Sequence, residues 1–193
     1  MVSVKRQFLA CGGGTEGITT LALDALTLNY TITLEGPDFD ARILEMTDRA
    51  FGPGRFVKTA ERLREQSRHQ ADLSFVAMQG DRLLGSVRLW PVFVFDDATN
   101  TYEPLAFLGP IVVDAACRGL GVGKAMMKAA LDAAFAKGLN AVLLVGSRSY
   151  FEPFGFEEAA GITLPGPVDP KRVLIAYRHP DGEKLRGRVV KVV

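Results

Sequence analysis

The stretch between residues 105 and 145 restricts the fold of this chain more than any other. An apolar run over 105–113 predicts a strand, and the segment CRGLGVGK follows it over 117–124. Helical periodicity extends over 121–137, and a uniformly apolar run over 141–145 predicts a strand buried on both faces. Strand, tight loop, helix and strand in this order form a βαβ unit, so we expect two parallel strands within a mixed sheet.

The predicted helix is apolar around most of its circumference. Lys124, Lys128 and Asp132 recur every four residues and form one narrow polar stripe. Gly138, just beyond its last residue, is typical of a left-handed helix terminator. We therefore expect this helix to be packed on most of its sides.

Three glycines, Gly119, Gly121 and Gly123, alternate along the chain where the strand gives way to this helix. A helix N-terminus presents unpaired backbone N–H groups and a partial positive charge, and it binds phosphate where no side chain blocks the approach. Without Cβ atoms the backbone can form a cup of N–H donors, with Arg118 or Lys124 adding charge at its rim. The segment therefore indicates an anion-binding loop.

Two other nucleotide-binding patterns fit this segment less well. A dinucleotide-binding loop requires G-x-G-x-x-G, and here the third glycine comes one residue early. A nucleoside triphosphate loop requires glycine five residues before its Gly-Lys pair and Ser or Thr after it, but Arg118 and Ala125 occupy these positions. A glycine-rich turn without a ligand stays open as an interpretation of the segment alone.

The composition narrows the classes of function. A chain of 193 residues is expected to form one domain, and its net charge of +1 gives no general attraction to nucleic acid or anionic lipid. No apolar run approaches the roughly 20 residues that span a bilayer, and glycines and acids interrupt any signal-peptide core. Cys11 and Cys117 are too few for a disulfide framework or a metal site. We expect a cytoplasmic protein with no metal and no nucleic-acid or membrane partner.

The remaining elements follow a regular order from Asn29 onward. Residues 1–28 match no periodic template, and we expect them to be an N-terminal extension of unknown role. The later elements predicted, in order, are a strand over 30–34, a helix capped by Asp38 or Asp40, a charged helix over 59–66, hairpin strands over 73–78 and 82–95, and a polar loop over 96–103.

Two segments of the sequence resemble a known family. Residues 113–123, VDAACRGLGVG, look like the acyl-CoA pyrophosphate loop of the GNAT N-acetyltransferases, whose signature Arg118, Gly121 and Gly123 fit. Residues 150–156, YFEPFGF, are similar to the family's second landmark, a short helix ending in Gly-Phe. The order of elements from residue 30 to 177 also matches, and the aromatic pair before Phe-Gly-Phe suggests the subgroup of predicted bacterial acetyltransferases resembling YhbS.

The resemblance implies an α/β (mixed α+β) fold with a GNAT-like central, mixed and partly splayed β-sheet flanked by helices. It implies an acyltransferase domain over 29–180, followed by a C-terminal tail over 181–193. The implied activity is transfer of acetyl from acetyl-CoA, a co-substrate, to a primary amine of a small molecule or peptide, in a monomer or homodimer. A binding module that keeps acyl-CoA affinity with little or no catalysis is the alternative.

The resemblance also implies which residues hold the co-substrate. The pantetheine arm is expected to pair with the splayed strand, and Pro110 suits that account because a proline within a strand implies a bulge or an unpaired edge. The cofactor-binding residues are then Ile111, Val112, Val113, Arg118, Gly119, Leu120, Gly121, Val122, Gly123, Lys124, Phe151 and Phe154.

Direct transfer needs a neutral amine and a protonated leaving thiol. An amine with a pKa of about 10.4 costs roughly 4.6 kcal/mol to neutralise at pH 7, whereas a thiolate with a thiol pKa of about 8.5 needs only about 2 kcal/mol of protonation. The base should therefore contribute more than the acid. Glu103 is the predicted base, with Asp96 and Asp97 as alternatives. Their place in a polar segment favours the other interpretation, that all three are solvated loop acids.

The position of the family's tyrosine acid holds Phe151 in this chain, which has no proton to give. The adjacent Tyr150 is the predicted general acid, although neighbouring helical side chains point about 100° apart. Arg88 and Trp90, which alternate on one strand face, are candidates for the acceptor side, as are Phe51 and Phe56. The sequence does not identify the amine.

Overall fold

The computed structural model describes residues 28–52, 59–64 and 67–191. All but the last residue of the predicted N-terminal extension lies outside these segments, as does the candidate acceptor-side residue Phe56. In these segments the chain forms a nine-stranded sheet with the strand order β1-β2-β3-β4-β5-β8-β6, while β9 pairs with β3 and β7 pairs with β9. The strands are β1 (Thr31–Leu34), β2 (Phe75–Gln79), β3 (Arg82–Asp96), β4 (Thr101–Val113), β5 (Ala141–Val145), β6 (Glu157–Glu158), β7 (Ile162–Thr163), β8 (Val173–Tyr177) and β9 (Gly187–Lys191). The helices are α1 (Asp40–Phe51), α2 (Thr59–Arg64), α3 (Val122–Ala136) and α4 (Arg148–Phe151).

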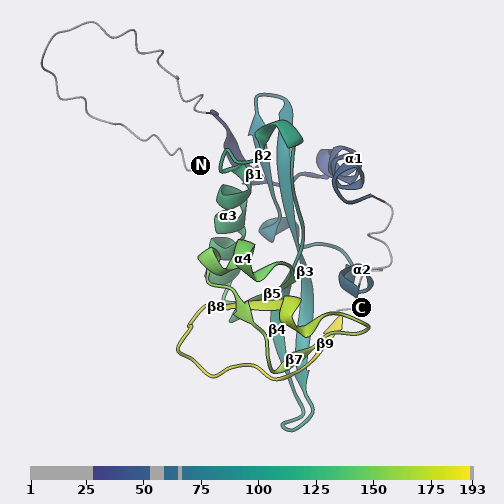
Figure 1. Cartoon of the computed structure of the whole chain (residues 1–193), viewed down its shortest axis with the longest axis vertical. Helices are drawn as coiled ribbons and strands as arrows, with labels where there is room; N and C mark the ends of the chain where they lie inside the picture. Colours follow the sequence, from purple (N-terminus) through teal and green to yellow (C-terminus); the bar gives the residue numbers. More distant parts are fainter. Residues whose placement is uncertain (1–27, 53–58, 65–66, 192–193) are drawn as a thin grey trace, which may run out of the picture.

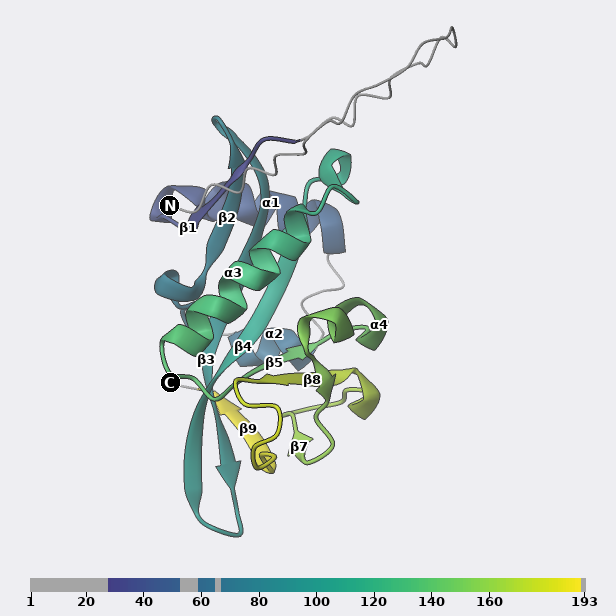
Figure 2. The ribbon, with the colours of Figure 1, turned by 90° about the vertical axis from the view of Figure 1, so that its left-hand side faces the viewer.

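The helices lie on both faces of the sheet. Figures 1 and 2 show α3 on one face, with α1 and α2 on the other. The apolar side of α3, with Met126 and Met127 fully buried, packs on side chains of β2, β3, β4 and β5. Ile43 of α1 and Leu63 of α2 are buried against the opposite face. The expected mixed sheet flanked by helices is therefore confirmed.

The hairpin of β3 and β4 forms the centre of the sheet and is longer than predicted. The two strands pair antiparallel from Gly85↔Val113 to Asp96↔Thr101. The polar loop expected over 96–103 is much shorter, because β4 already begins at Thr101. Tyr102 packs against Phe95 with ring centroids 4.5 Å apart, and this aromatic pair favours continued strand pairing near the turn.

The predicted parallel pair, β4 and β5, holds together over a short length only. Ala106↔Val142 and Phe107↔Leu143 are its register partners, and beyond Phe107 the two strands separate. Just past this point β4 carries a bulge, since the register with β3 shifts between Leu89↔Leu108 and Val87↔Ile111. Two residues of β4 therefore oppose Arg88, as the proline in this strand predicted. The sheet splays open at this position.

The expected C-terminal tail contributes a strand to the same sheet. Val92–Phe95 of β3 pair with residues 188–191 of β9, and Val189 is buried. We propose that one domain extends from about residue 28 to 191. Of the helices in the described segments, none has both the length and the apolar character to cross a membrane.

Candidate functional site

The glycine segment forms a turn that leads from β4 into α3. Gly119 and Gly121 have φ angles of 79° and 83°, a region that residues with side chains rarely adopt. A Cβ atom placed on either glycine would meet no atom within 4 Å, so both backbones face open space. The left-handed Gly121 is also the residue from which α3 begins, and no side chain caps the helix there.

The backbone N–H groups of this turn point to an anion site. Within the described segments, no protein atom accepts a hydrogen bond from the N–H of Gly119, Gly121, Val122, Gly123 or Lys124. The helix satisfies its first internal donor only at Ala125, which bonds to the carbonyl of Gly121 at 3.0 Å. These N–H groups and the positive end of the α3 dipole can therefore bind a phosphate group.

A cavity of about 480 Å³ lies over this turn and gathers most of the predicted cofactor residues. Its lining consists of Ala50, Phe51, Ile111, Val112, Val113, Cys117, Arg118, Gly119, Gly121, Val122, Gly123, Lys124 and Tyr150. Leu120 is missing from this lining, and its side chain is exposed on the loop surface. We keep the backbone of Leu120 in the loop but assign no contact to its side chain.

A second cavity, of about 630 Å³, opens where β4 leaves β5. It contains Leu108, Gly109 and Pro110 of the bulge on one side and Gly146 and Ser147 beyond β5 on the other. Phe51, Ile111 and Tyr150 line both this cleft and the cavity over the turn. The two cavities therefore form one track that runs from the glycine turn into the splayed sheet.

The track continues past α3 in the other direction. Lys124 lines the cavity over the turn and also a third cavity of about 530 Å³, bounded by α3 on one side and by Pro153 and Phe154 on the other. Phe154 is thus placed beyond the glycine turn, away from the splayed strands. An elongated ligand can contact Phe154, the turn amides and the bulge together.

The structure distinguishes the two neighbouring aromatic residues of α4. Tyr150 lines the track, and its hydroxyl oxygen lies 3.1 Å from the position that a Cβ on Gly123 would take. Phe151 also lines the cleft, but most of its ring is buried, 5.8 Å from the ring of Phe156 and packed directly on Gly146. Of these two residues, Tyr150 alone carries a hydroxyl and also lines the cavity over the glycine turn.

Glu103 does not reach this track. It lies near the opposite end of β4, on the order of 20 Å from Pro110 at about 3.3 Å per strand residue, and it accepts a hydrogen bond from the side chain of Asn140. The alternatives also lie at that end, where Asp96 accepts from the N–H of Ala98 in the hairpin turn. Since these carboxylates cannot meet a thioester at the bulge, we do not retain Glu103 as the base.

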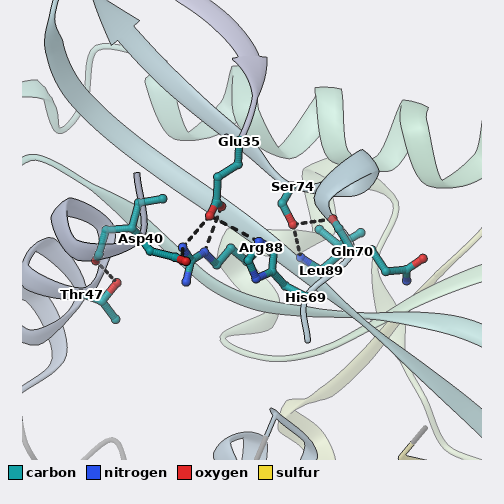
Figure 3. A network of polar contacts seen from close by, with 9 residues as sticks. Glu35, Asp40, Thr47, His69, Gln70, Ser74, Arg88 and Leu89 are labelled. Carbon is teal, nitrogen blue, oxygen red and sulfur yellow. Dashed lines mark hydrogen bonds and ion pairs between the residues drawn. The ribbon is translucent and has the colours of Figure 1, made fainter. Parts of the chain in front are cut away.

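A further cavity of about 780 Å³ lies beneath α1. We call it the acceptor cavity, because the sequence predicted acceptor-side residues that line it. The predicted Arg88 and Trp90 line it, and Pro110 joins it to the splayed cleft. Figure 3 shows the network at its floor, where Arg88 donates from Nε to Glu35 Oε2 at 2.9 Å and from Nη2 to Glu35 Oε1. Arg88 also pairs with Asp40 of α1.

Sequence analysis did not find Glu35 or His69 in this network. The side chain of Glu35 is only 1 % exposed, and its Oε1 lies 3.3 Å from His69 Nε2. Burial by itself would raise the pKa of Glu35, because it disfavours the charged carboxylate. The hydrogen bonds from His69 and Arg88, together with the positive charge of Arg88, outweigh this effect and lower the pKa. Desolvation likewise disfavours the charged Arg88, yet Glu35 and Asp40 raise its pKa. Glu35 therefore carries a negative charge at neutral pH.

The sequence offers little indication of this network, because the residues that form it are far apart in the chain. Glu35 follows β1 directly and precedes Gly36-Pro37, so it looks like an ordinary loop acid. Its partner Arg88 is 53 positions away. Within the described residues no group of three or more His, Cys, Asp or Glu is placed to hold a metal ion.

Comparison with known proteins agrees with this geometry. Residues 41–156 match the model of the acetyltransferase (GNAT) family. The structure resembles the GNAT family N-acetyltransferase YhbS from Escherichia coli, solved in complex with CoA, with a TM-score of 0.68 and 24% identity over 84% of this chain and 89% of that one. It also resembles a GNAT family acetyltransferase from Brucella melitensis in complex with acetyl-CoA, with a TM-score of 0.62 and 23% identity over 85% and 96% of the two chains. No similar sequence was found among curated proteins.

Proposed function

Because the chain belongs to the acetyltransferase (GNAT) family, we propose that it moves an acetyl group from acetyl-CoA to a primary amine of a small molecule or peptide. The observation that carries this proposal is the track between the glycine turn and the splayed sheet. At the turn, backbone N–H groups have no protein acceptor within the described residues, and the track leads from there to the cleft between β4 and β5. Two similar structures contain CoA or acetyl-CoA, which supports the choice of donor.

The residues along the track fit the parts of acetyl-CoA in order. The amides of Gly121 and Gly123 suit the pyrophosphate, and no Cβ stands between them and an anion. Arg118 and Lys124 add positive charge at the rim. A pantetheine arm can pair with the edge of β4 at Ile111, because β5 has already separated from β4 at this point.

Co-substrate contacts then extend to both ends of the track. Val113 lies beside the turn, and Phe154 offers an aromatic surface beyond Lys124, where the adenosine would lie. Acetyl-CoA supplies the activated thioester carbonyl on which the amine acts. The bulge at Gly109 and Pro110 places this end of the track against the acceptor cavity, since Pro110 lines both. The amine can therefore approach from the α1 side while the thiol leaves toward Tyr150.

Tyr150 is the proposed general acid for the leaving thiolate. Its hydroxyl lies beside the N-terminus of α3 and lines the cleft and the turn cavity alike. Protonating a thiolate calls for about 2 kcal/mol at pH 7, so the loss of this hydroxyl should slow the reaction but leave it measurable. A binding module without catalysis was the alternative suggested by Phe151, and the position of Tyr150 favours the enzyme.

The proposal is tested by measuring thiol release from acetyl-CoA in the presence of a panel of primary amines. The panel should contain amino acids, polyamines, aminoglycosides and peptides with free N-termini. We expect release that depends on an amine and a product heavier by one acetyl group. Binding of acetyl-CoA without release across the whole panel would favour the binding module, and stabilisation by ATP or NAD in preference to CoA would contradict the proposal.

A further inference from the structure

Removal of a proton from the amine is the costlier part of acetyl transfer, and Glu103 is too distant to accept it. Among the described residues that line the acceptor cavity, Glu35, Asp40 and His69 are the side chains able to take up a proton near neutral pH or below. The base for the proposed reaction is therefore sought among these three.

Neither carboxylate suits this role. Glu35 is almost completely buried and accepts hydrogen bonds from Arg88 and His69, so both of its oxygens are already engaged. The same contacts lower its pKa, which makes it a weaker base. Asp40 is 66 % exposed at the rim and paired with Arg88. A carboxylate that gains from staying charged has little tendency to take a proton from an amine.

His69 has the geometry of a base. Its side chain is 23 % exposed and lines the cavity, while its Nε2 faces the carboxylate of Glu35 at 3.3 Å. A neutral imidazole has one N–H and one lone pair, and the nitrogen next to a carboxylate carries the hydrogen. The lone pair then falls on Nδ1. The carboxylate behind the ring also stabilises the imidazolium that forms when Nδ1 takes a proton.

The position of His69 relative to the bulge is fixed through Trp90. The imidazole meets the indole edge-on with ring centroids 5.9 Å apart. The indole in turn packs directly on Gly109, where an added Cβ would lie only 2.0 Å from Cζ3. One aromatic ring therefore separates His69 from the part of β4 at which the thioester is expected. Figure 3 shows His69, Glu35 and Arg88 gathered at one place, with Glu35 just after the end of β1 and Arg88 on β3.

We propose that His69 accepts the proton of the attacking amine through Nδ1, and that Glu35, held by Arg88, positions it. This inference rests on the proposed function. The ammonium N–H bond breaks, its electron pair stays on nitrogen, and the proton joins Nδ1. The amine nitrogen then bonds to the thioester carbon, the C–S bond breaks with its pair on sulfur, and Tyr150 protonates that sulfur. The second amine proton returns through solvent to the Tyr150 oxygen, and His69 releases its proton to solvent.

The charged groups around His69 come from several elements. Glu35 follows β1, Arg88 lies on β3, Asp40 on α1 and Arg64 on α2, and Arg68 is its neighbour in sequence. Arg64 lies over the ring of Trp90, 5.4 Å from the ring centroid. Glu35 contacts His69 directly, with Oε1 3.3 Å from Nε2. We therefore expect Glu35 to set the orientation and the tautomer of His69.

The state of His69 can be measured by NMR without a known acceptor. The chain has only two histidines, so a tag-free His179→Gln variant leaves His69 as the single imidazole signal. We expect ¹⁵N-detected tautomer signals of Nε2–H with an unprotonated Nδ1 at high pH. In the Glu35→Gln variant, the share of the Nε2–H tautomer should fall, because an amide oxygen accepts this hydrogen less strongly than a carboxylate. An Nδ1–H tautomer in the wild type, or an unchanged tautomer ratio in folded Glu35→Gln protein, would overturn the pairing of His69 with Glu35.

Kinetics test the same inference once the panel has yielded an amine. We expect His69→Gln to lower kcat by about 100-fold with the KM for acetyl-CoA unchanged, and to remove the acidic limb of the pH–rate profile. The control is His179→Gln, because His179 lines a separate cavity near Glu103. A His69→Gln rate within threefold of wild type at every pH would refute the base. If the wild-type protein shows no turnover with any amine of the panel, the proposed function itself is contradicted. The NMR experiment then still tests the pairing of His69 with Glu35.

Discussion

The glycine turn and the acceptor cavity meet at the same bulge but are built in opposite ways. At the turn, successive backbone donors of Gly121, Val122 and Gly123 have no protein acceptor within the described residues. In the acceptor cavity, the charged side chains of Glu35 and Arg88 are bound to each other and shielded from water. One region keeps its polar groups available for a ligand, and the other uses them to fix its own shape.

This difference indicates how each region contributes. A turn whose donors are already oriented can bind a diphosphate with little rearrangement, so we expect it to supply affinity for the co-substrate. The internally paired cavity supplies rigid geometry, because a buried ion pair resists displacement. Changes at the turn should mainly affect binding, whereas changes at Glu35 should mainly affect stability and the rate of reaction.

The largest effect is expected from breaking the buried pair. Glu35→Gln leaves Arg88 with one carboxylate partner, so it should lower the free energy of unfolding at pH 7 by about 3 kcal/mol. The lowered pKa of Glu35 means that its contribution is present above the ordinary carboxyl pKa and is lost as the pH falls through the lower, folded value. Urea unfolding of wild type and variant at pH 7 and at pH 3 measures both effects.

The control for this experiment is the exposed partner in the same network. Asp40→Asn should change the free energy of unfolding by less than about 1 kcal/mol, as expected for a largely exposed pair. A gap between wild type and Glu35→Gln that stayed the same size at low pH would show that the carboxylate is not charged in the folded protein.

The next effect is expected at the turn. Gly121→Val forces a branched side chain onto a residue with φ of 83°, and relief of this strain turns the neighbouring N–H groups away from the cavity. Losing one or two hydrogen bonds to a charged phosphate should weaken CoA binding by about 100-fold, measured by calorimetry. Leu120→Ala should bind within about twofold of wild type, because the side chain does not line the cavity. Equal affinity of a folded Gly121→Val protein would exclude the turn as the phosphate site.

Replacement of Tyr150, the proposed general acid, should have an intermediate effect. Tyr150→Phe removes the hydroxyl but keeps the ring, so we expect kcat to fall by about 30-fold, equivalent to about 2 kcal/mol, with CoA affinity preserved. Adding Phe151→Tyr to this variant should not restore the rate, because the ring at position 151 is held against Phe156 and Gly146 and does not line the cavity over the glycine turn. Steady-state kinetics of both proteins test the assignment, and restoration by the second change would mean that position 151 holds the functional hydroxyl.

The smallest effect is expected from the rim of the turn. Arg118 is exposed, so Arg118→Ala should weaken CoA binding by only about fivefold, or about 1 kcal/mol, and less at high salt. Titrations at low and high ionic strength measure this, with Arg186→Ala at the distant cavity as the matched control. A loss as large as that of Gly121→Val would mean that the side chain, and not the backbone, carries the binding.

The sequence predicted the turn and the fold around it because their signals are local. Strand, glycines and helix are contiguous, and Pro110 marked the bulge directly. The acceptor network could not be predicted in the same way, since Glu35 and Arg88 meet only through sheet pairing over 53 positions. Which of Tyr150 and Phe151 reaches the glycine turn depended on where α4 begins, and one residue turns a helical side chain by about 100°.

The prediction of Glu103 as the base failed because it relied on the position of this residue in the sequence. It precedes the splayed segment in sequence, yet β4 is long enough to carry it to the far end of the hairpin. Strand length was underestimated because residues 96–103 are polar, as a loop would be, although the aromatic contact of Tyr102 with Phe95 extends the pairing.

A crystal structure of the protein with acetyl-CoA would show whether the glycine turn binds the diphosphate. We expect diphosphate oxygens about 3 Å from the backbone nitrogens of the turn, the sulfur next to the Tyr150 hydroxyl, and the acetyl group at the Gly109 bulge. A diphosphate bound away from Gly119–Gly123, with these amides directed to solvent or protein, would contradict this expectation.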